Sequence, residues 1–152
     1  DDVESRGLGD VYKRQLESYT AISAPFRTDD SDTPPHLGVD FAAAGGTPVQ
    51  AAQSGVVTQA GWDDDHGYFV TIYHGADAAA NDDGTYPANY ATSYAHLQSK
   101  PAVQVGQRVA QGDVIGYVGN TGDVRGANGG YHLHVELRIN GTRTDPLQYI
   151  PH

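Results

Sequence analysis

Short β-type runs, separated by turn residues, repeat through the chain from Tyr19 onward. Within each run, residues alternate in polarity or are rich in Val, Ile and Tyr, and Gly, Asp or Asn separates it from the next. No long amphipathic helical pattern accompanies them. Asn140-Gly141 predicts a hairpin turn, because both residues tolerate a positive φ. The pattern predicts an all-β fold, with strands near residues 47–51, 55–60, 68–74, 92–96, 114–118 and 131–139.

The length of 152 residues suits a single domain with a hydrophobic core. The first residues, DDVESRGLGDVYKRQ, differ from the rest, since they show no regular hydrophobic period and resemble translated adapter sequence. We therefore expect residues 1–18 to be a non-native or disordered leader, with an ordinary frayed N-terminus as the alternative. Residues 19–152 then form the domain.

Composition excludes several classes of site and partner. Because cysteine is absent, the chain has no disulfide, no thiol nucleophile and no thiolate zinc site, so any metal is held by His, Asp or Glu. The formal net charge of −10, from 19 acidic and 9 basic residues, argues against nucleic acid as a partner. No apolar run approaches the length of a transmembrane segment, and the sequence as given shows no signal peptide.

Two histidine motifs stand out among the 7 histidines. One is HLGVD, which spaces His36 and Asp40 four residues apart. The other is HLH on the last long predicted strand, where His132 and His134 point to one face and Leu133 to the core. Their Cα atoms are expected to lie roughly 6.5 Å apart, which is twice the rise per residue of a strand. Taken alone, this pair is best interpreted as two histidines on a solvated face.

The HLGVD motif changes that interpretation. His36 and Asp40 supply one nitrogen and one oxygen ligand, and Gly38 between them permits the chain to bend. One histidine of the HLH pair completes a set of two nitrogens and one oxygen, which is typical of catalytic zinc sites that keep a fourth position open. Such zinc activates water for hydrolysis, with histidines for general acid–base catalysis. His96 and His132 are the candidates for that role.

A succession of motifs makes the resemblance specific. HLGVDFAA at 36–43 is followed by GTPVQAAQSGVVTQAG at 46–61 and SYAHL at 93–97, and then by VGQRVAQGDVIGYVGNTG at 105–122 and HLHVEL at 132–137. This order resembles the lysostaphin-type (LytM-like) zinc metallopeptidase family. The resemblance implies an all-β, duplicated-hybrid-motif-like architecture with long loops, in which an antiparallel sheet forms a narrow groove.

The resemblance also implies a role for each motif residue. His36, Asp40 and His134 correspond to the ligands of one Zn²⁺ per chain, and His132 and His96 correspond to catalytic residues. The implied activity is that of a metalloendopeptidase, a peptidoglycan hydrolase that cuts peptide cross-links in bacterial cell walls with a metal-activated water. The implied partners are peptidoglycan stem or bridge peptides, and the implied protein is a monomer that is exported to the periplasm, the cell wall or the medium.

Some questions stay open at this stage. The motifs do not distinguish a pentaglycine bridge from a direct D-Ala–diaminopimelate link as the bond that is cut. The alternatives to an active enzyme are a domain of the same fold with an inactive site, which activates another wall hydrolase, and a carrier or carbohydrate-binding β domain with incidental histidines.

Other polar residues receive expectations of their own. We expect His74 to be structural and His66 to be solvated in its acidic loop. We expect Glu136 to pair with Arg138, with orientation of a ligand histidine as the alternative. The long polar loop over residues 75–91 is expected either to form a wall of the groove or to make no contact with substrate.

Overall fold

The computed structural model describes residues 14–28, 35–75, 90–124 and 128–152. Its strands are β1 (Ala21–Ala24), β2 (Val39–Ala42), β3 (Pro48–Gln50), β4 (Gly55–Asp63), β5 (Gly67–Tyr73), β6 (Tyr90–Leu97), β7 (Arg108–Val109), β8 (Val114–Tyr117), β9 (His132–Ile139) and β10 (Thr142–Thr144). Two short 3₁₀ helices, η2 (Asn128–Gly130) and η3 (Pro146–Gln148), are the described helical elements. The prediction of an all-β, antiparallel fold is confirmed. No helix in the described ranges has the length and apolar character needed to span a membrane.

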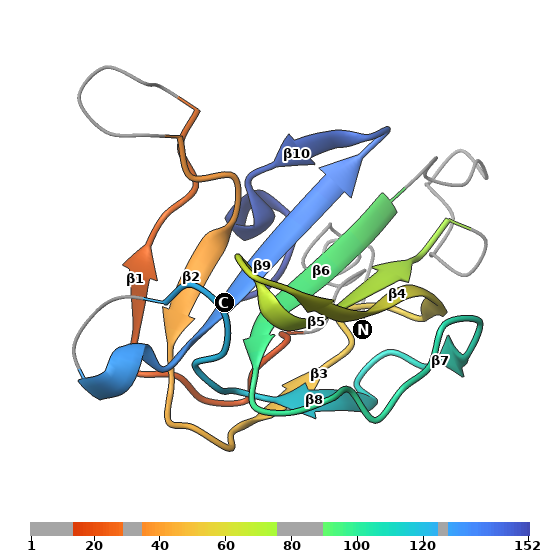
Figure 1. Cartoon of the computed structure of the whole chain (residues 1–152). Helices are drawn as coiled ribbons and strands as arrows, with labels where there is room; N and C mark the ends of the chain where they lie inside the picture. Colours follow the sequence, from red (N-terminus) through yellow and green to blue (C-terminus); the bar gives the residue numbers. More distant parts are fainter. Residues whose placement is uncertain (1–13, 29–34, 76–89, 125–127) are drawn as a thin grey trace.

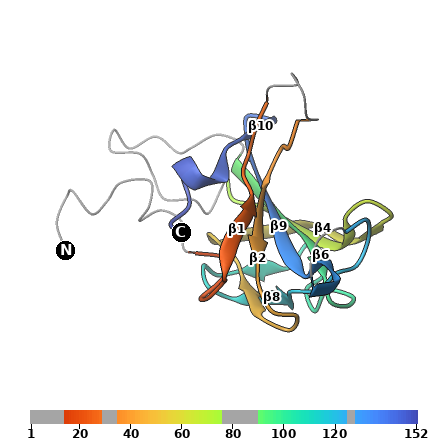
Figure 2. The same ribbon diagram turned by 90° about the vertical axis from the view of Figure 1, so that its left-hand side faces the viewer.

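A large antiparallel sheet organises the molecule around β9 (Figure 1). Its strand order is β1-β2-β9-β6-β5-β4-β7, and β10 pairs with β9 outside this series. Strand β6 occupies one edge of β9, while β2 pairs with its first half and β10 with its second half along the other edge. A second, two-stranded sheet is formed by β3 and β8 and lies below the large sheet in Figures 1 and 2.

The two faces of the large sheet differ in chemistry. On β9, Leu133 and Val135 are fully buried, and they join Phe41 of β2 in the hydrophobic core. Val49 of β3 and Ile115 of β8 belong to the same core, so the small sheet closes this apolar face. The alternation of a strand then turns the intervening polar residues of β9 to the opposite face of the sheet. That polar face carries the candidate site.

The strands predicted from the sequence all coincide with observed strands, with ends that differ by up to three residues. The turn at Asn140-Gly141 is confirmed as well, since it joins β9 to β10 with φ of 52° and 80° at the two residues. Strands β1, β2, β7 and β10 were missed. They are only two to four residues long, and β2 forms through pairing with β9, far away in the sequence, which its own residues do not indicate.

The packed part of the chain begins before residue 19. Leu16 is fully buried in the core, and the backbone N–H of Gln50 donates a hydrogen bond of 2.7 Å to the carbonyl of Gln15. The boundary expected at residue 19 is therefore too late for residues 15 and 16, while residues 1–13 lie outside the described part of the chain. Most of the loop expected over residues 75–91 also lies outside it, and the end of that stretch belongs to β6.

Candidate metal centre and groove

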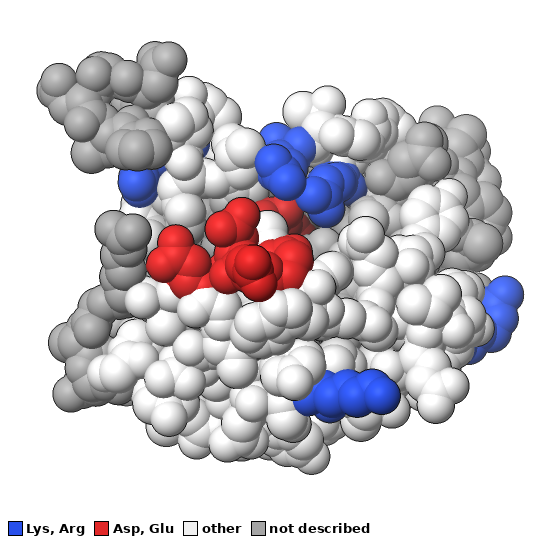
Figure 3. Space-filling model, viewed as in Figure 1, with Lys and Arg blue, Asp and Glu red and all other residues white. Residues whose placement is uncertain are grey.

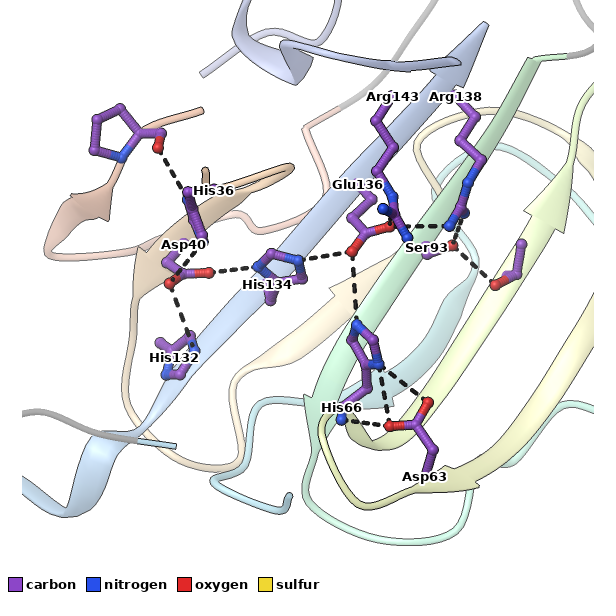
Figure 4. A network of polar contacts seen from close by, with 12 residues as sticks. His36, Asp40, Asp63, His66, Ser93, His132, His134, Glu136, Arg138 and Arg143 are labelled. Carbon is purple, nitrogen blue, oxygen red and sulfur yellow. Dashed lines mark hydrogen bonds and ion pairs between the residues drawn. The ribbon is translucent and has the colours of Figure 1, made fainter. Parts of the chain in front are cut away.

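His36, Asp40 and His134 meet at the start of β9 (Figure 4). Asp40 on β2 is directly opposite His134 on β9 in the strand register, although 94 residues separate them in the sequence. The Nδ1 of His134 lies 2.7 Å from Oδ1 of Asp40, and the Nε2 of His36 lies 3.3 Å from its Oδ2. One ligand atom from each of the three residues lies within 4.8 Å of the others. The cross-strand pair and the four-residue spacing together create the cluster.

This donor set fits a zinc ion. Tetrahedral bonds of about 2.0–2.2 Å place two ligand atoms roughly 3.3 Å apart, close to the separations observed here. The remaining ring nitrogens are held by other groups: Nδ1 of His36 donates to the carbonyl of Pro25 at 2.9 Å, and Nε2 of His134 donates to Oε2 of Glu136 at 3.0 Å. Such outer hydrogen bonds fix the tautomer and the orientation of metal-binding histidines.

Electrostatics at the cluster favour a cation. Burial alone would raise the pKa of Asp40, but hydrogen bonds from His134 and His36 hold it well below its usual range. Burial alone would lower the pKa of His134, but hydrogen bonds and negative charge from Asp40 and Glu136 raise it to about 9. The two carboxylates therefore stabilise positive charge on either side of the His134 ring.

His132 and His96 lie beside this cluster, with ring centroids 4.7 Å apart. The Nδ1 of His132 donates to the carbonyl of Gly130 at 2.7 Å, and the Nδ1 of His96 donates to the carbonyl of Thr121 at 2.7 Å. Since a carbonyl can only accept, each Nδ1 carries a proton and Nε2 is left free to exchange one. Burial lowers the pKa of His96 to about 4, with help from the neighbouring His132 and His134. His96 is therefore neutral near pH 7.

A bulge in β6 brings His96 to the groove. Simple alternation would place it on the core side with Tyr94, which is fully buried. Between the pairs Val70–Tyr94 and Tyr68–Leu97, however, β6 contains one residue more than β5, and His96 has a φ of 60°. A positive φ is uncommon for residues other than glycine and often marks a functional position. The extra residue turns the imidazole to the side of His132.

Gly38 is required for close packing rather than for a bend. A Cβ at this position would lie 2.5 Å from the carbonyl oxygen of Val135 and 2.6 Å from Cε1 of His134. Its backbone does not require a positive φ, so the expected role in permitting a bend is replaced by a role in making room for the His134 ring. A glycine at this position allows β2 to approach β9 closely at the cluster.

His66 and Glu136 extend the cluster on the other side of His134. His66 is partly exposed, with 38% of its side chain accessible, but it is also held at the site: its Nδ1 contacts Asp63 at 3.0 Å, and its Nε2 lies 3.6 Å from Oε2 of Glu136. Hydrogen bonding to Glu136 raises the pKa of His66. Glu136 pairs with Arg138 at 3.2 Å as expected, and it also contacts His134. Sequence reasoning missed His66 because only the β4–β5 turn brings it to the site.

His74 has the structural role expected of it. The side chain is fully buried, and its two ring nitrogens contact the carbonyl of Ser54 at 2.9 Å and Oγ1 of Thr92 at 2.7 Å. Thr92 continues this chain of contacts to the hydroxyl of Tyr94, which accepts a hydrogen bond from the backbone N–H of Ala52. These contacts satisfy polar groups in the interior.

Two adjoining cavities form a groove along the polar face, and both are lined by His134. One has a volume of about 550 Å³ and contains all the site residues expected from the sequence, namely His36, Asp40, His96, His132 and His134. The other, of about 190 Å³, is lined by His66, Ser93, Glu136 and Arg138 among others. Figure 3 shows this face, with Asp and Glu side chains gathered in its hollow and Lys and Arg side chains along its border.

Comparison with known proteins finds similar sequences and structures. The sequence model of peptidase family M23 matches residues 34–146 of this chain. The chain is 38% identical over 111 residues to the peptidoglycan DD-endopeptidase ShyC of Vibrio cholerae, and 40% identical over 112 residues to the DD-carboxypeptidase/endopeptidase Mpg of Neisseria meningitidis. These matches cover 73% and 74% of this chain but 22% of each relative, so the chain spans about a fifth of their length.

Solved structures with a similar fold are found as well. The catalytic domain of lysostaphin from Staphylococcus simulans matches with a TM-score of 0.60 and 30% identity, over 87% of this chain and 90% of that one. Helicobacter pylori Csd3 matches with a TM-score of 0.71 and 28% identity, over 93% of this chain and 35% of that one.

Proposed function

The chain belongs to peptidase family M23, and on that basis we propose that it is a zinc-dependent endopeptidase that hydrolyses peptide cross-links of bacterial peptidoglycan. The observation that carries the proposal is the meeting of His36, Asp40 and His134 with His96 and His132 in one open cavity. The relatives described as peptidoglycan DD-endopeptidases support the choice of substrate.

His36, Asp40 and His134 would hold the zinc ion, through Nε2, a carboxylate oxygen and Nδ1 respectively. When bound, zinc supplies a Lewis acid that lowers the pKa of water and polarises a carbonyl group. Glu136 orients the His134 ring by accepting its Nε2 proton, and the carbonyl of Pro25 does the same for His36. Two neutral nitrogens and one carboxylate leave a net positive charge on the centre.

His132 and His96 would carry the proton transfers. The Nε2 of His132 lies 3.8 Å from Oδ2 of Asp40, so this nitrogen borders the ligand cluster. A neutral imidazole with a free Nε2 can accept a proton from the attacking water and deliver it to the amine that leaves. The carbonyls of Gly130 and Thr121 hold the two rings in the tautomer that this exchange requires.

The alternatives considered from the sequence are less well supported. A domain of this fold that only activates another hydrolase needs neither a complete ligand set nor both additional histidines, yet all of them line the same cavity here. A carrier or carbohydrate-binding domain gives no reason for outer hydrogen bonds on every one of these imidazoles. We further propose that the enzyme acts outside the cytoplasm, where peptidoglycan lies, and that it is a monomer.

Digestion of purified peptidoglycan tests this function. The zinc-loaded chain is expected to release new amino and carboxyl ends within the stem or bridge peptides, identified by mass spectrometry of the soluble fragments. The His132→Ala variant is the matched control and is expected to release few. The absence of new peptide ends with the zinc-loaded chain, on walls of both cross-link types, would contradict the proposal.

A further inference from the structure

An exposed aromatic pair lies near the end of the β4–β5 hairpin, outside the groove. Trp62, the one tryptophan of the chain, is 51% exposed. Its indole packs edge-to-face on Tyr68, its partner across the hairpin, with ring centroids 5.0 Å apart. The Nε1 of Trp62 donates to Oδ1 of Asp64 at 3.3 Å, and Tyr68 packs against the hydrophobic core. These contacts fix the orientation of the indole and leave much of it accessible.

Trp62 and Tyr68 form one wall of a cavity of about 430 Å³. The other wall is the segment over residues 100–105, which follows β6. Val103 anchors this segment in the core, and the backbone N–H of Gly106 just after it donates to a carbonyl of β4 at 2.8 Å. Because the fold fixes both walls, the cavity is formed before any ligand binds. Its size lies within the roughly 300–1,000 Å³ of pockets for small ligands.

The lining combines an aromatic face with hydrogen-bond donors. Lys100 and Gln104 are exposed at the cavity, and Val105 adds an apolar side chain that is 63% exposed. The described residues that line it include no Asp or Glu, although the net charge of the chain is −10. A pyranose ring fits this combination, because its C–H groups pack on an aromatic face while the oxygens at its rim accept hydrogen bonds.

A protein partner is the main alternative occupant of this cavity. A stable protein interface buries about 1,200–2,000 Å² in total and has an apolar centre. Of the large hydrophobic residues that are exposed in the described ranges, Trp62 and Val105 alone line the cavity. The neighbouring residues Gln107 and Arg108 are exposed and polar. The small apolar area within a polar surround favours a small amphipathic ligand.

The β4–β5 hairpin separates this cavity from the groove. Asp63 of β4 lines the groove with His134, whereas Trp62 lines the aromatic cavity, because successive side chains of a strand point to opposite faces. Among the described strands, β7 is the outer neighbour of β4, and it pairs with β4 at residues 55 and 56 alone. Beside Trp62 the sheet therefore ends at β4, and a ligand that crosses this free edge contacts both faces of the hairpin.

A peptidoglycan stem peptide is long enough to connect the two places. Strands β6 and β5 lie between β9, which carries His134, and β4 (Figure 1). Three strand separations of about 4.8 Å place β4 roughly 14 Å from β9. A four-residue stem peptide extends to roughly 13–14 Å, and a lactyl group joins its first residue to a sugar of the glycan strand. A cross-link held at the candidate centre thus lets that sugar reach the free edge of β4.

We infer that the cavity between Trp62 and residues 100–105 binds an N-acetylated sugar of the glycan strand that bears the peptides; the choice of this glycan rests on the proposed function. Trp62 supplies the surface on which the sugar stacks, and Lys100 and Gln104 donate to its oxygens. The hairpin then holds the substrate on two faces, with the peptide in the groove and the glycan on the opposite side. This second contact lowers KM for glycan-bearing substrates and leaves kcat unchanged.

The fluorescence of Trp62 tests the sugar site without any hydrolysis. Because the chain has one tryptophan, a change in its emission reports on this cavity. Tetra-N-acetylglucosamine, a neutral glycan without peptides, is expected to give a saturable change in the zinc-loaded chain. Gln104→Ala removes one donor and is expected to raise the Kd about 2- to 10-fold. Tyr117→Ala is the matched control, since it removes an exposed aromatic ring outside the cavity and is expected to leave the Kd unchanged.

Hydrolysis of two matched substrates tests whether the site serves the enzyme. One is a cross-linked peptide dimer that still carries its disaccharides, and the other is the same dimer without sugars. Trp62→Ala is expected to raise KM for the glycan-bearing dimer about 10-fold, with its kcat and both constants for the sugar-free dimer unchanged. Trp62→Phe keeps an aromatic face and is expected to retain most of the affinity.

Three results would overturn the inference. No saturable fluorescence change, with equal KM for the two dimers in the unaltered chain, removes the sugar site and leaves the proposed function intact. An equal loss on both dimers in Trp62→Ala, together with a lower Tm, assigns the indole a structural role. A fluorescence change that follows protein concentration rather than sugar concentration assigns the cavity to a second copy of the chain. Saturable sugar binding by a chain that cuts no cross-link would instead support the site and reject the proposed function.

Discussion

Replacement of Glu136 by glutamine tests how the His134 ring is held. Glutamine keeps the size of the side chain and can still accept a hydrogen bond from Nε2 of His134, now 3.0 Å from the carboxylate. What it loses is the negative charge. Hydrogen bonds to charged groups contribute about 1.5–3 kcal/mol and those between neutral groups about 0.5–1.5 kcal/mol. The difference is roughly 1–1.5 kcal/mol, or a zinc affinity about 10-fold weaker.

Competition against a zinc chelator of known affinity measures this effect. Glu17→Gln makes the same chemical change at an exposed residue outside the groove, and we expect it to leave the zinc affinity unchanged. An unchanged affinity in Glu136→Gln would refute the orienting role of the carboxylate. A loss of more than about 1000-fold, far above the usual 10- to 100-fold for such outer contacts, would also refute it. It would indicate that Glu136 binds the metal directly, in the alternative cluster with His66 and His134.

Four further substitutions test catalysis, packing and stability. His132→Ala and His96→Ala are expected to keep zinc but to lose about 10²–10⁴-fold in turnover of cross-link peptides, and loss of the metal in either would mean that a ligand had been taken for a proton carrier. Gly38→Ala is expected to displace the His134 ring and reduce zinc content, measured by elemental analysis, because the added Cβ would lie 2.6 Å from that ring; wild-type zinc would disprove the close-packing argument. Tyr94→Phe is expected to reduce the free energy of unfolding in urea by about 1–3 kcal/mol, since it leaves buried hydrogen-bonding groups unpaired, and an unchanged midpoint would count against that.

Local patterns predicted the part of the site that depends on strand alternation. The HLH motif places Leu133 in the core and His132 and His134 on the polar face, as the period of two requires. Strand β9 is long enough for this rule to hold along its whole length. The partner strand β2, with four residues, was not recognised, although it carries Asp40.

The remaining features arise from contacts that no local pattern contains. His96 reaches the groove through a bulge relative to β5, and a rule of strict alternation places it in the core. His66 arrives at the site because the β4–β5 turn folds back toward Glu136. An acidic run of three aspartates before it favours a solvated loop when the sequence is considered alone. In both cases the register between strands, rather than the residue's own neighbours, decides where the side chain lies.

Zinc content of the purified chain and of its Asp40→Ala variant tests the central claim most directly. The Asp40 carboxylate contacts Nε2 of His36 and Nδ1 of His134. Its removal therefore takes away the oxygen ligand and the negative charge that lies between the two imidazole rings. Elemental analysis is expected to find about one zinc per unaltered chain and far less in the variant, with both giving the same β-type circular dichroism. A full complement of zinc in folded Asp40→Ala would contradict the assignment of His36, Asp40 and His134 as the metal centre.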